Sequence, residues 1–534
     1  MIKQIRLIFL ILCSVWAKTQ QLPMVLIDQE TQQKVLRKDS LAAAQFLDSL
    51  VEQHYYFAKV LRVEQKPEQI EILYDKGKNY NQAWVVFSPE IMEKLQFPTP
   101  YFTPNLEALK HQINQKYIDE GYAFSRVKTQ YLRMKDEVPE VKISLVKTEK
   151  RTIDGFQIRG YERLPKRVVK NLERQFVGKT YEPQALEKIM KVFQNHQFVA
   201  LERSPQTLFT ADSTQVFLFL KKKKANYFDG VLGFGNNDSE KISLTGSLNF
   251  NFKNIFNAFE TVHFFWQKNP NGGQTFNLET ELPYILNSDV GAQFQMNIFR
   301  QDSTFANVKI QPSLYYQWQN QHKIGLKGHF ELSSALQERT TAKNFNKKGV
   351  GLWYEFEQNS PYELLLYQTK VKAEASALQM QDMDAEQHFG QQYYEVFGEH
   401  NIRLKGRHFL NVKAEMVGIS TPEQLSVNEM LRLGGWNSLR GFNENSLLAQ
   451  FYAYGSAEYR YLIGNQAFFD VFTQLAHLQN PSFDRAIRLY SIGTGFRIKL
   501  PLGIMSFQIS NGTAFGEPLR FKDTKIHWGI LAQF

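Results

Sequence analysis

The chain has 534 residues and a formal net charge of +10, and 14% of its residues are aromatic. This length excludes a single ordinary soluble domain and predicts two or more folding units. The basic balance does not indicate a nucleic-acid partner, because no basic recognition helix accompanies it. The one cysteine is Cys13, so disulfide bonds are not expected to stabilise the mature chain.

Residues 1–17 have the pattern of a secretory signal peptide. Lys3 and Arg6 precede an apolar run over residues 7–15, and a small residue, Ala17, closes the segment. Attachment of a lipid to Cys13 would require a small residue before it, and Leu12 is bulky. No later stretch approaches the roughly 18 consecutive apolar residues of a membrane helix. The sequence therefore predicts an exported protein.

The mean hydropathy is negative although aromatic residues are abundant. Membrane β-barrels combine these properties, because lipid-facing and lumen-facing residues alternate along each strand. A soluble, secreted all-β protein would show the same averages. Composition leaves both classes open.

The N-terminal half contains three copies of one small α+β unit, predicted over residues 22–76, 77–150 and 151–224, with a period of about 65 to 75 residues. Residues 101–109 and 181–189 each place a proline near a helix start, followed by apolar residues at helical spacing. A helix over residues 40–53 marks the fainter first copy, and two short strands follow each helix. On these residues alone, an α+β repeat without a binding role remains the alternative.

From residue 225 to residue 534 the pattern changes to strict alternation. Residues 241–252, 276–282, 410–416, 490–500 and 526–534 are clear examples. We count about eleven alternating segments before residue 431 and about five after residue 447, enough for a closed barrel of about sixteen strands.

The interrupting stretch, residues 431–447, is rich in Gly, Asn and Ser and predicts a loop. Its centre is Leu439-Arg-Gly-Phe442, an aliphatic residue followed by Arg440, Gly441 and an aromatic residue. This resembles the inward-folded loop of the BamA/TamA superfamily of outer-membrane insertases (the bacterial surface antigen family), in which the loop follows the eleventh of sixteen strands. The N-terminal copies resemble the periplasmic POTRA modules of that superfamily. The resemblance implies a membrane β-barrel of about sixteen antiparallel strands preceded by POTRA-like modules.

Strand parity predicts what faces the loop. If Tyr459 and Val471 face lipid, Glu458 and Asp470 face the lumen, and Arg440 is expected to dock against both carboxylates. By the same parity Gly493 and Gly495 face the lumen. Two glycines in one strand indicate close approach by another backbone, and the loop is the expected neighbour.

These positions also resemble the superfamily motifs. The segment from Phe468 to Asp470 is similar to its aromatic-x-Asp motif, and the segment from Gly493 to Gly495 to its Gly-x-Gly motif. Glu458 corresponds to the glutamate that meets the loop arginine. One residue departs from the pattern, because Phe472 stands where the superfamily has glycine.

The chain ends on an aromatic residue. Trp528, Gly529 and Phe534 resemble the C-terminal β-signal by which the assembly machinery recognises outer-membrane barrels. The alternative is that the last aromatic residue is an interfacial anchor.

No nucleophile motif, metal-ligand spacing or cofactor motif stands out, so we predict neither an enzyme nor a cofactor. The resemblance implies an outer-membrane assembly factor of a Gram-negative bacterium, with its modules in the periplasm. Unfolded outer-membrane proteins and outer-membrane lipids are the implied partners, with accessory periplasmic proteins or lipoproteins left open. The sequence does not identify the client or distinguish a general insertase from a specialised paralogue.

Two other functions remain as alternatives. A two-partner-secretion transporter would export a polypeptide through a similar barrel, but such proteins usually place a plug helix and a Pro-rich linker before two modules. Residues 18–38 show neither feature, and three modules are counted. A passive porin or adhesin would leave the residues expected around Arg440 unexplained.

Overall fold

The computed structural model describes residues 22–533 except 162, 195, 197–198, 224, 237–241, 269–272, 338–340, 363, 366, 437, 482–485 and 501–502. The predicted signal peptide with Cys13, and the terminal Phe534, lie outside the described residues. The chain forms two compact units. The N-terminal unit extends to Thr152 and includes Gly178–Ala185, and the barrel unit comprises Ile153–Val177 and the chain from Leu186 onward.

The first sheet has the strand order β2-β1-β4-β3, with β1 parallel to β4. The predicted first helix is α2, which begins after Asp39, whose carboxylate accepts a hydrogen bond from the Ala42 amide at 2.7 Å. The apolar side chains of Leu26, Leu50 and Tyr74 form the core between helix and sheet. The elements are β1 (Met24–Asp28), β2 (Lys34–Arg37), α2 (Ser40–Glu52), β3 (Lys59–Gln65) and β4 (Ile70–Asp75).

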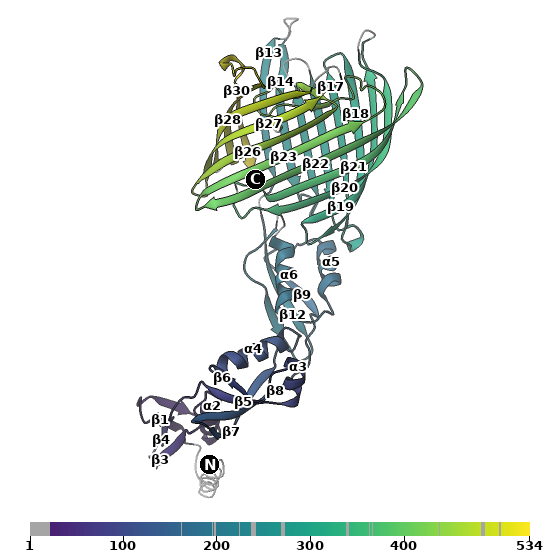
Figure 1. Cartoon of the computed structure of the whole chain (residues 1–534). Coiled ribbons are helices and arrows are strands. Elements are labelled where there is room, and N and C mark those ends of the chain that lie inside the picture. Colours follow the sequence, from purple (N-terminus) through teal and green to yellow (C-terminus); the bar gives the residue numbers. More distant parts are fainter. Residues whose placement is uncertain are drawn as a thin grey trace. The chain divides into compact units, whose positions relative to one another are not determined.

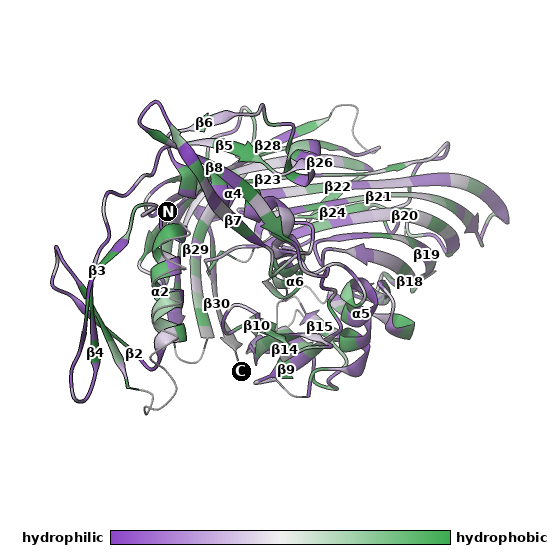
Figure 2. Ribbon diagram, turned by 90° about the horizontal axis from the view of Figure 1, so that it is seen from below, coloured by the Kyte–Doolittle hydropathy of each residue, from purple (hydrophilic) through white to green (hydrophobic). Residues whose placement is uncertain are grey.

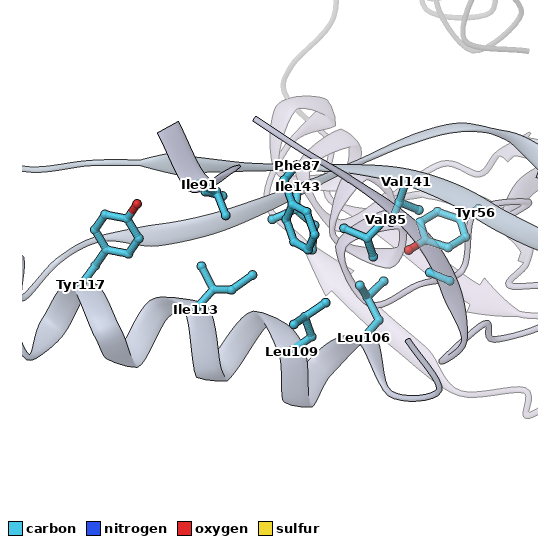
Figure 3. Packing of buried hydrophobic residues seen from close by; sticks show 11 residues of the cluster. Tyr56, Val85, Phe87, Ile91, Leu106, Leu109, Ile113, Tyr117, Val141 and Ile143 are labelled. Atoms are coloured by element: carbon cyan, nitrogen blue, oxygen red, sulfur yellow. The ribbon is translucent and has the colours of Figure 1, made fainter. Parts of the chain in front are cut away.

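The second sheet repeats this plan, with the order β6-β5-β8-β7 and β5 parallel to β8. Figure 3 shows Leu106, Leu109, Ile113 and Tyr117 of α4 facing the sheet residues, at the helical spacing that the sequence predicts. Residues 101–103 are a strand rather than helix, because Asn105 caps α4 and starts it at Leu106. The elements are β5 (Ala83–Phe87), α3 (Pro89–Leu95), β6 (Tyr101–Thr103), α4 (Leu106–Ile118), β7 (Arg126–Lys135) and β8 (Val138–Val146).

The third sheet has β12 at its centre, paired with β9, β10 and β11. It carries α5, which the sequence pattern did not single out, and α6, which begins at the predicted proline. Burial in the barrel unit, together with the nearby cations Lys223 and Lys323, lowers the pKa of His196 to about 4. The elements are β9 (Gly155–Arg159), α5 (Lys166–Phe176), α6 (Pro183–Gln194), β10 (Val199–Leu201), β11 (Gln206–Phe209) and β12 (Thr214–Lys222).

The remaining long strands form one closed antiparallel barrel of sixteen strands, β13 to β23 and β26 to β30 (Figure 1). The first eleven are β13 (Tyr227–Asn236), β14 (Ile242–Lys253), β15 (Thr261–Lys268), β16 (Gln274–Leu282), β17 (Val290–Gln301), β18 (Phe305–Trp318), β19 (His322–Ala335), β20 (Phe345–Asn359), β21 (Tyr367–Asp382), β22 (Gln387–Lys405) and β23 (His408–Ser420). The last five are β26 (Phe451–Ile463), β27 (Ala467–Gln479), β28 (Ile487–Leu500), β29 (Gly503–Ala514) and β30 (Lys525–Gln533). Short 3-10 turns, η1 (Ile285–Asn287) and η2 (Phe521–Asp523), lie between strands.

The predicted fold class is confirmed, with eleven strands before the loop and five after it. Figure 2 shows hydrophilic and hydrophobic residues alternating along the barrel strands. Along β27, for example, Val471 is 48% exposed while its neighbour Asp470 is 3% exposed. Such alternation gives the barrel an apolar outer surface and a polar interior. Among the described residues, no helix is both long and apolar enough to cross a membrane.

Candidate functional site

The predicted loop folds as a short hairpin whose strands are β24 (Leu431–Leu433) and β25 (Leu447–Ala449). Gly434, Gly435 and Gly441 have φ angles of +107°, +104° and +90°. Side chains other than glycine rarely adopt these values, so the glycines permit the sharp turns at the hairpin tip. A Cβ on Gly441 would lie 2.7 Å from the backbone of Asn511, which shows that the loop lies directly against β29.

Two apolar residues of the motif hold the loop inside the barrel. Leu439 is fully buried and belongs to a cluster with Tyr452, Tyr454 and Leu489 from the barrel wall. Phe442 packs at the edge of the same cluster. Burial of a leucine side chain contributes about 1.5 to 3 kcal/mol, so these contacts favour the docked loop.

Arg440 makes polar and aromatic contacts to two adjacent strands. Its Nη1 donates to Glu458 Oε2 at 2.8 Å and its Nη2 to Ser456 Oγ at 3.2 Å, both on β26. Gln474 of β27 accepts a bond from the Arg440 backbone amide at 2.8 Å. The guanidinium carbon lies 3.4 Å from the ring centroid of Phe472, a stacking contact. The aromatic residue that departs from the superfamily pattern is therefore part of the arginine's site.

Glu458 lies between two arginines. Its Oε1 accepts from Arg460 Nε at 2.5 Å, and Arg460 also donates to Asn401 Oδ1 at 2.9 Å. Glu458 is 3% exposed. A buried carboxylate is stable in the ionised form only when it is paired, and here two guanidinium groups surround it.

The expected contact between Arg440 and Asp470 is not formed among the described residues. Asp470 is also buried and faces the lumen, but its Oδ1 has no hydrogen-bond partner there. Arg440 instead meets β27 farther along the same inward face, at Phe472 and Gln474. The expectation that Arg440 docks against both carboxylates thus needs correction, because in the described part of the chain Arg440 forms an ion pair with Glu458 and none with Asp470.

The expected role of the β28 glycines also differs. A Cβ on Gly493 would meet the Phe472 ring, and a Cβ on Gly495 would lie 2.7 Å from the carboxylate of Asp470. Their absent side chains therefore make room for β27 side chains and not for the loop backbone. The loop instead packs against Gly512 of β29, where a Cβ would lie 2.5 Å from the Phe442 ring.

Phe468 lies beside Arg460, whose guanidinium carbon is 5.6 Å from its ring centroid. It is fully buried with Leu364, Leu365 and Phe409. Sequence reasoning missed Ser456, Phe472 and Gln474 as contacts of Arg440. Parity could have found the last two, because residues 470, 472 and 474 share one face of β27.

The first and last barrel strands meet over a short segment. Among the described residues, β13 and β30 pair at only three positions, Tyr227 with Gln533, Phe228 with Ala532 and Asp229 with Leu531. By contrast β13 pairs with β14 along its whole length, from Tyr227 to Asn236. We call the β13–β30 junction the seam. Of the predicted β-signal residues, Trp528 and Gly529 lie on β30, and Trp528 is 56% exposed.

The lumen beside the loop is polar. One cavity of about 650 Å³ is lined by Arg432 and Glu444 of the loop together with wall residues such as Asn277 and Lys309. A second cavity, of about 470 Å³, is lined largely by Lys, Glu, Gln and Tyr side chains. Within the described part of the chain, no group of three or more His, Cys, Asp or Glu side chains could hold a metal ion.

Residues 368–530, which form the second half of the barrel with its loop, match the Omp85 superfamily domain. The resemblance to the BamA/TamA superfamily is thereby confirmed. No curated protein matches the chain.

Solved structures of this superfamily have the same fold. BamA from Haemophilus ducreyi lacking POTRA domains 1–3 is 12% identical, with a TM-score of 0.52 over 86% of this chain and 100% of that one. CdiB from Acinetobacter baumannii is 13% identical, with a TM-score of 0.53 over 92% of this chain and 98% of that one. CdiB from Escherichia coli is 14% identical, with a TM-score of 0.52 over 92% of this chain and 97% of that one.

Proposed function

We propose that this chain is an outer-membrane assembly factor that helps β-barrel precursors or similar clients to enter the membrane. The observation that carries the proposal is the seam, where two barrel strands pair at three positions among the described residues. Backbone groups in lipid must be hydrogen-bonded, and each unsatisfied group costs several kcal/mol. A client strand that pairs with the edge of β13 or β30 would satisfy these groups, and its folding would be templated there.

The N-terminal sheets support a role in receiving clients. We propose that residues 22–76, 77–150 and 151–224 are three POTRA-like modules located in the periplasm. Strands β3 and β7 lie at sheet edges. An extended client can add a strand at such an edge through backbone hydrogen bonds, so varied sequences are tolerated.

The docked loop supports the same function and argues against a passive pore. A porin would gain nothing from an arginine stacked on Phe472 and paired with Glu458 in its lumen. We propose that Leu439, Arg440, Gly441 and Phe442 fasten the loop to β26, β27 and β29. This contact stiffens the C-terminal half of the barrel, so that opening is confined to the seam.

Polypeptide export, as in a two-partner-secretion transporter, is the second candidate. The fold likeness to CdiB over 92% of this chain is the observation that favours it. Export requires a continuous path through the lumen, whereas assembly requires an opening at the seam. The two functions therefore differ in where the client crosses the barrel.

Depletion of the protein distinguishes the two functions. An assembly factor is expected to leave several barrel proteins depleted from the outer membrane and their precursors accumulated in the periplasm. A transporter is expected to leave barrel proteins at normal levels while one secreted polypeptide is missing from the medium. Quantitative mass spectrometry of both fractions measures this, and normal barrel levels would refute the assembly function.

A further inference from the structure

Two turns at the barrel rim that joins the third sheet expose apolar side chains. Phe256, between β14 and β15, is 78% exposed, and Leu286, in η1 between β16 and β17, is 91% exposed. Leu286 also has a φ angle of +53°, which side chains other than glycine rarely adopt. A leucine that is both exposed and strained has no stabilising role in water, and such features concentrate at functional sites.

Helix α5 presents a basic face. Its buried side is formed by Val168, Leu172 and Phe176 at helical spacing. Another side of the helix carries Lys166, Lys170 and Arg174, which follow one another at intervals of four residues. The full set of cations on and just before the helix is Arg163, Lys166, Arg167, Lys170 and Arg174. In the part of the chain that the structure describes, Arg174 alone of these five takes part in an ion pair.

The same helix is fastened to the rim beside Leu286. Arg174 forms an ion pair with Asp289, three residues beyond Leu286. Asn171 and Gln175 donate to the same carboxylate at 2.8 and 3.0 Å. Lys166 and Lys170 are exposed and, at a spacing of four residues, lie on the same side of α5 as Arg174.

We propose that α5 and these two turns form a binding surface for the anionic headgroups of phospholipids in the leaflet at this rim. The proposal rests on the placement of the barrel in an outer membrane, but not on the client it handles. The rim of a membrane barrel lies at the headgroup level. Apolar side chains there enter the acyl boundary while neighbouring cations attract lipid phosphates.

Lipid fits this surface better than an acidic polypeptide does. An acidic segment would pair with the cations but would leave Leu286 and Phe256 in water. A membrane surface satisfies both features at once, since it offers phosphates and hydrocarbon within a few ångströms of each other. An acidic peptide is therefore the occupant that the experiment must exclude.

The full chain in lipid nanodiscs allows a direct test. A bimane fluorophore on Glu173→Cys, an exposed position on α5, reports contact with lipid that carries a nitroxide on its headgroup. We expect strong quenching in phosphatidylglycerol discs, weak quenching in phosphatidylcholine discs, and release by 0.5 M salt. Equal quenching in both lipids, or greater displacement by polyglutamate than by salt of equal ionic strength, would overturn the proposal.

Reversing the charge of two lysines on α5 tests the electrostatic contribution to lipid binding. One cation near an anionic surface contributes roughly a fivefold gain in binding. The double variant Lys166→Glu, Lys170→Glu should therefore need at least an order of magnitude more phosphatidylglycerol for half-maximal quenching. The matched control, Arg520→Glu with Lys522→Glu, makes the same charge change next to and within η2, between β29 and β30. It should leave quenching unchanged.

A third variant tests the contribution of the apolar side chain to lipid binding separately from that of the charges. Leu286→Ser keeps every charge and should weaken lipid contact several-fold. Heat-modifiable mobility in gels verifies that each variant is a folded barrel. If both variants are folded barrels and neither changes the quenching, the proposed lipid-binding surface is refuted. The assembly function would remain open, because neither measurement involves a client.

Discussion

Two regions of the same barrel differ in how firmly their strands are held. Strands β26 to β29 are paired along most of their length and are covered from inside by the loop, with Arg440 joining β26 to β27. At the seam, only one strand away from β29, β30 meets β13 at three positions among the described residues. The loop thus lies mainly against the wall next to the seam, and its Trp436 also contacts His527 of β30, with ring centroids 5.3 Å apart. The seam is therefore the junction at which we propose that the barrel opens.

The largest effect is expected from a covalent crosslink across the seam. Phe228 and Ala532 face each other in register, and Cβ atoms of directly opposite residues lie about 4.5 to 5.5 Å apart. Phe228→Cys with Ala532→Cys should therefore form a disulfide or accept a short crosslinker. Because a locked seam offers no free edge to a client, we expect complete loss of assembly activity, restored by reductant. Full activity in the crosslinked protein would refute lateral opening.

The control is a crosslink in the firmly held region. Ile509 and Ile526 are register partners on β29 and β30. Cysteines at these two positions join strands that stay together when the seam opens. Activity is expected to survive this crosslink.

The next largest effect is expected from removal of the loop arginine. Arg440→Ala leaves Glu458 with one guanidinium partner fewer, and breaking a buried ion pair costs about 3 to 5 kcal/mol. The loop should undock and activity should fall strongly. Arg440→Lys should recover only part of it, because an ammonium cannot contact Glu458, Ser456 and Phe472 at once.

Hydrogen exchange of residues 438–442 measures undocking, and reconstituted client insertion measures activity. Arg488→Ala, at an exposed position on β28, is the matched control and should be neutral. Retained protection of the loop in the Arg440→Ala protein would show that Leu439 and Phe442 hold it without the ion pair.

The alternation of polar and apolar residues in the sequence predicted the barrel well. It predicted the residues that contact Arg440 only in part. Alternation fixed the strand count and the inward direction of Glu458 and Asp470, because side chains alternate across a strand regardless of distant contacts. It could not decide which carboxylate receives Arg440. That choice depends on how far along β27 the loop descends, a consequence of tertiary packing of Gly441 against Asn511.

The glycines illustrate the same limit. The sequence identifies Gly493 and Gly495 as positions where space is needed, but not what fills that space. The ring of Phe472 and the carboxylate of Asp470 fill it, since these two residues of β27 oppose the glycines in register. Cross-strand register becomes visible only when the sheet is assembled.

Residues at the end of β30 should affect the amount of folded barrel in the membrane rather than its activity. Phe534 lies outside the described residues, directly after the seam position Gln533. If residues 528–534 are a β-signal, Phe534→Asp should reduce the amount of folded barrel several-fold, because recognition by the assembly machinery is impaired. Heat-modifiable mobility and outer-membrane abundance measure this. Normal levels would leave the interfacial-anchor interpretation, and Trp528→Phe serves as a conservative control.

The smallest effect is expected from the aromatic residue beneath the arginine. Phe472→Leu keeps an apolar side chain against Gly493 but removes the ring on which Arg440 stacks. Such stacking contributes about 0.5 to 2 kcal/mol, well below the cost of losing the ion pair to Glu458. We therefore expect faster hydrogen exchange in the loop and only a few-fold loss of activity.

Phe469→Leu is the control, because Phe469 lies on the same strand, is 41% exposed and faces away from the lumen. Phe472→Gly, which restores the superfamily's residue, removes both the stack and the packing against Gly493. If Phe472→Leu were as damaging as Arg440→Ala, shape packing between β27 and β28 would dominate the site instead of the arginine's charge. If Phe472→Gly were harmless, the stack would be dispensable, and Glu458, Ser456 and Gln474 would suffice to hold the loop.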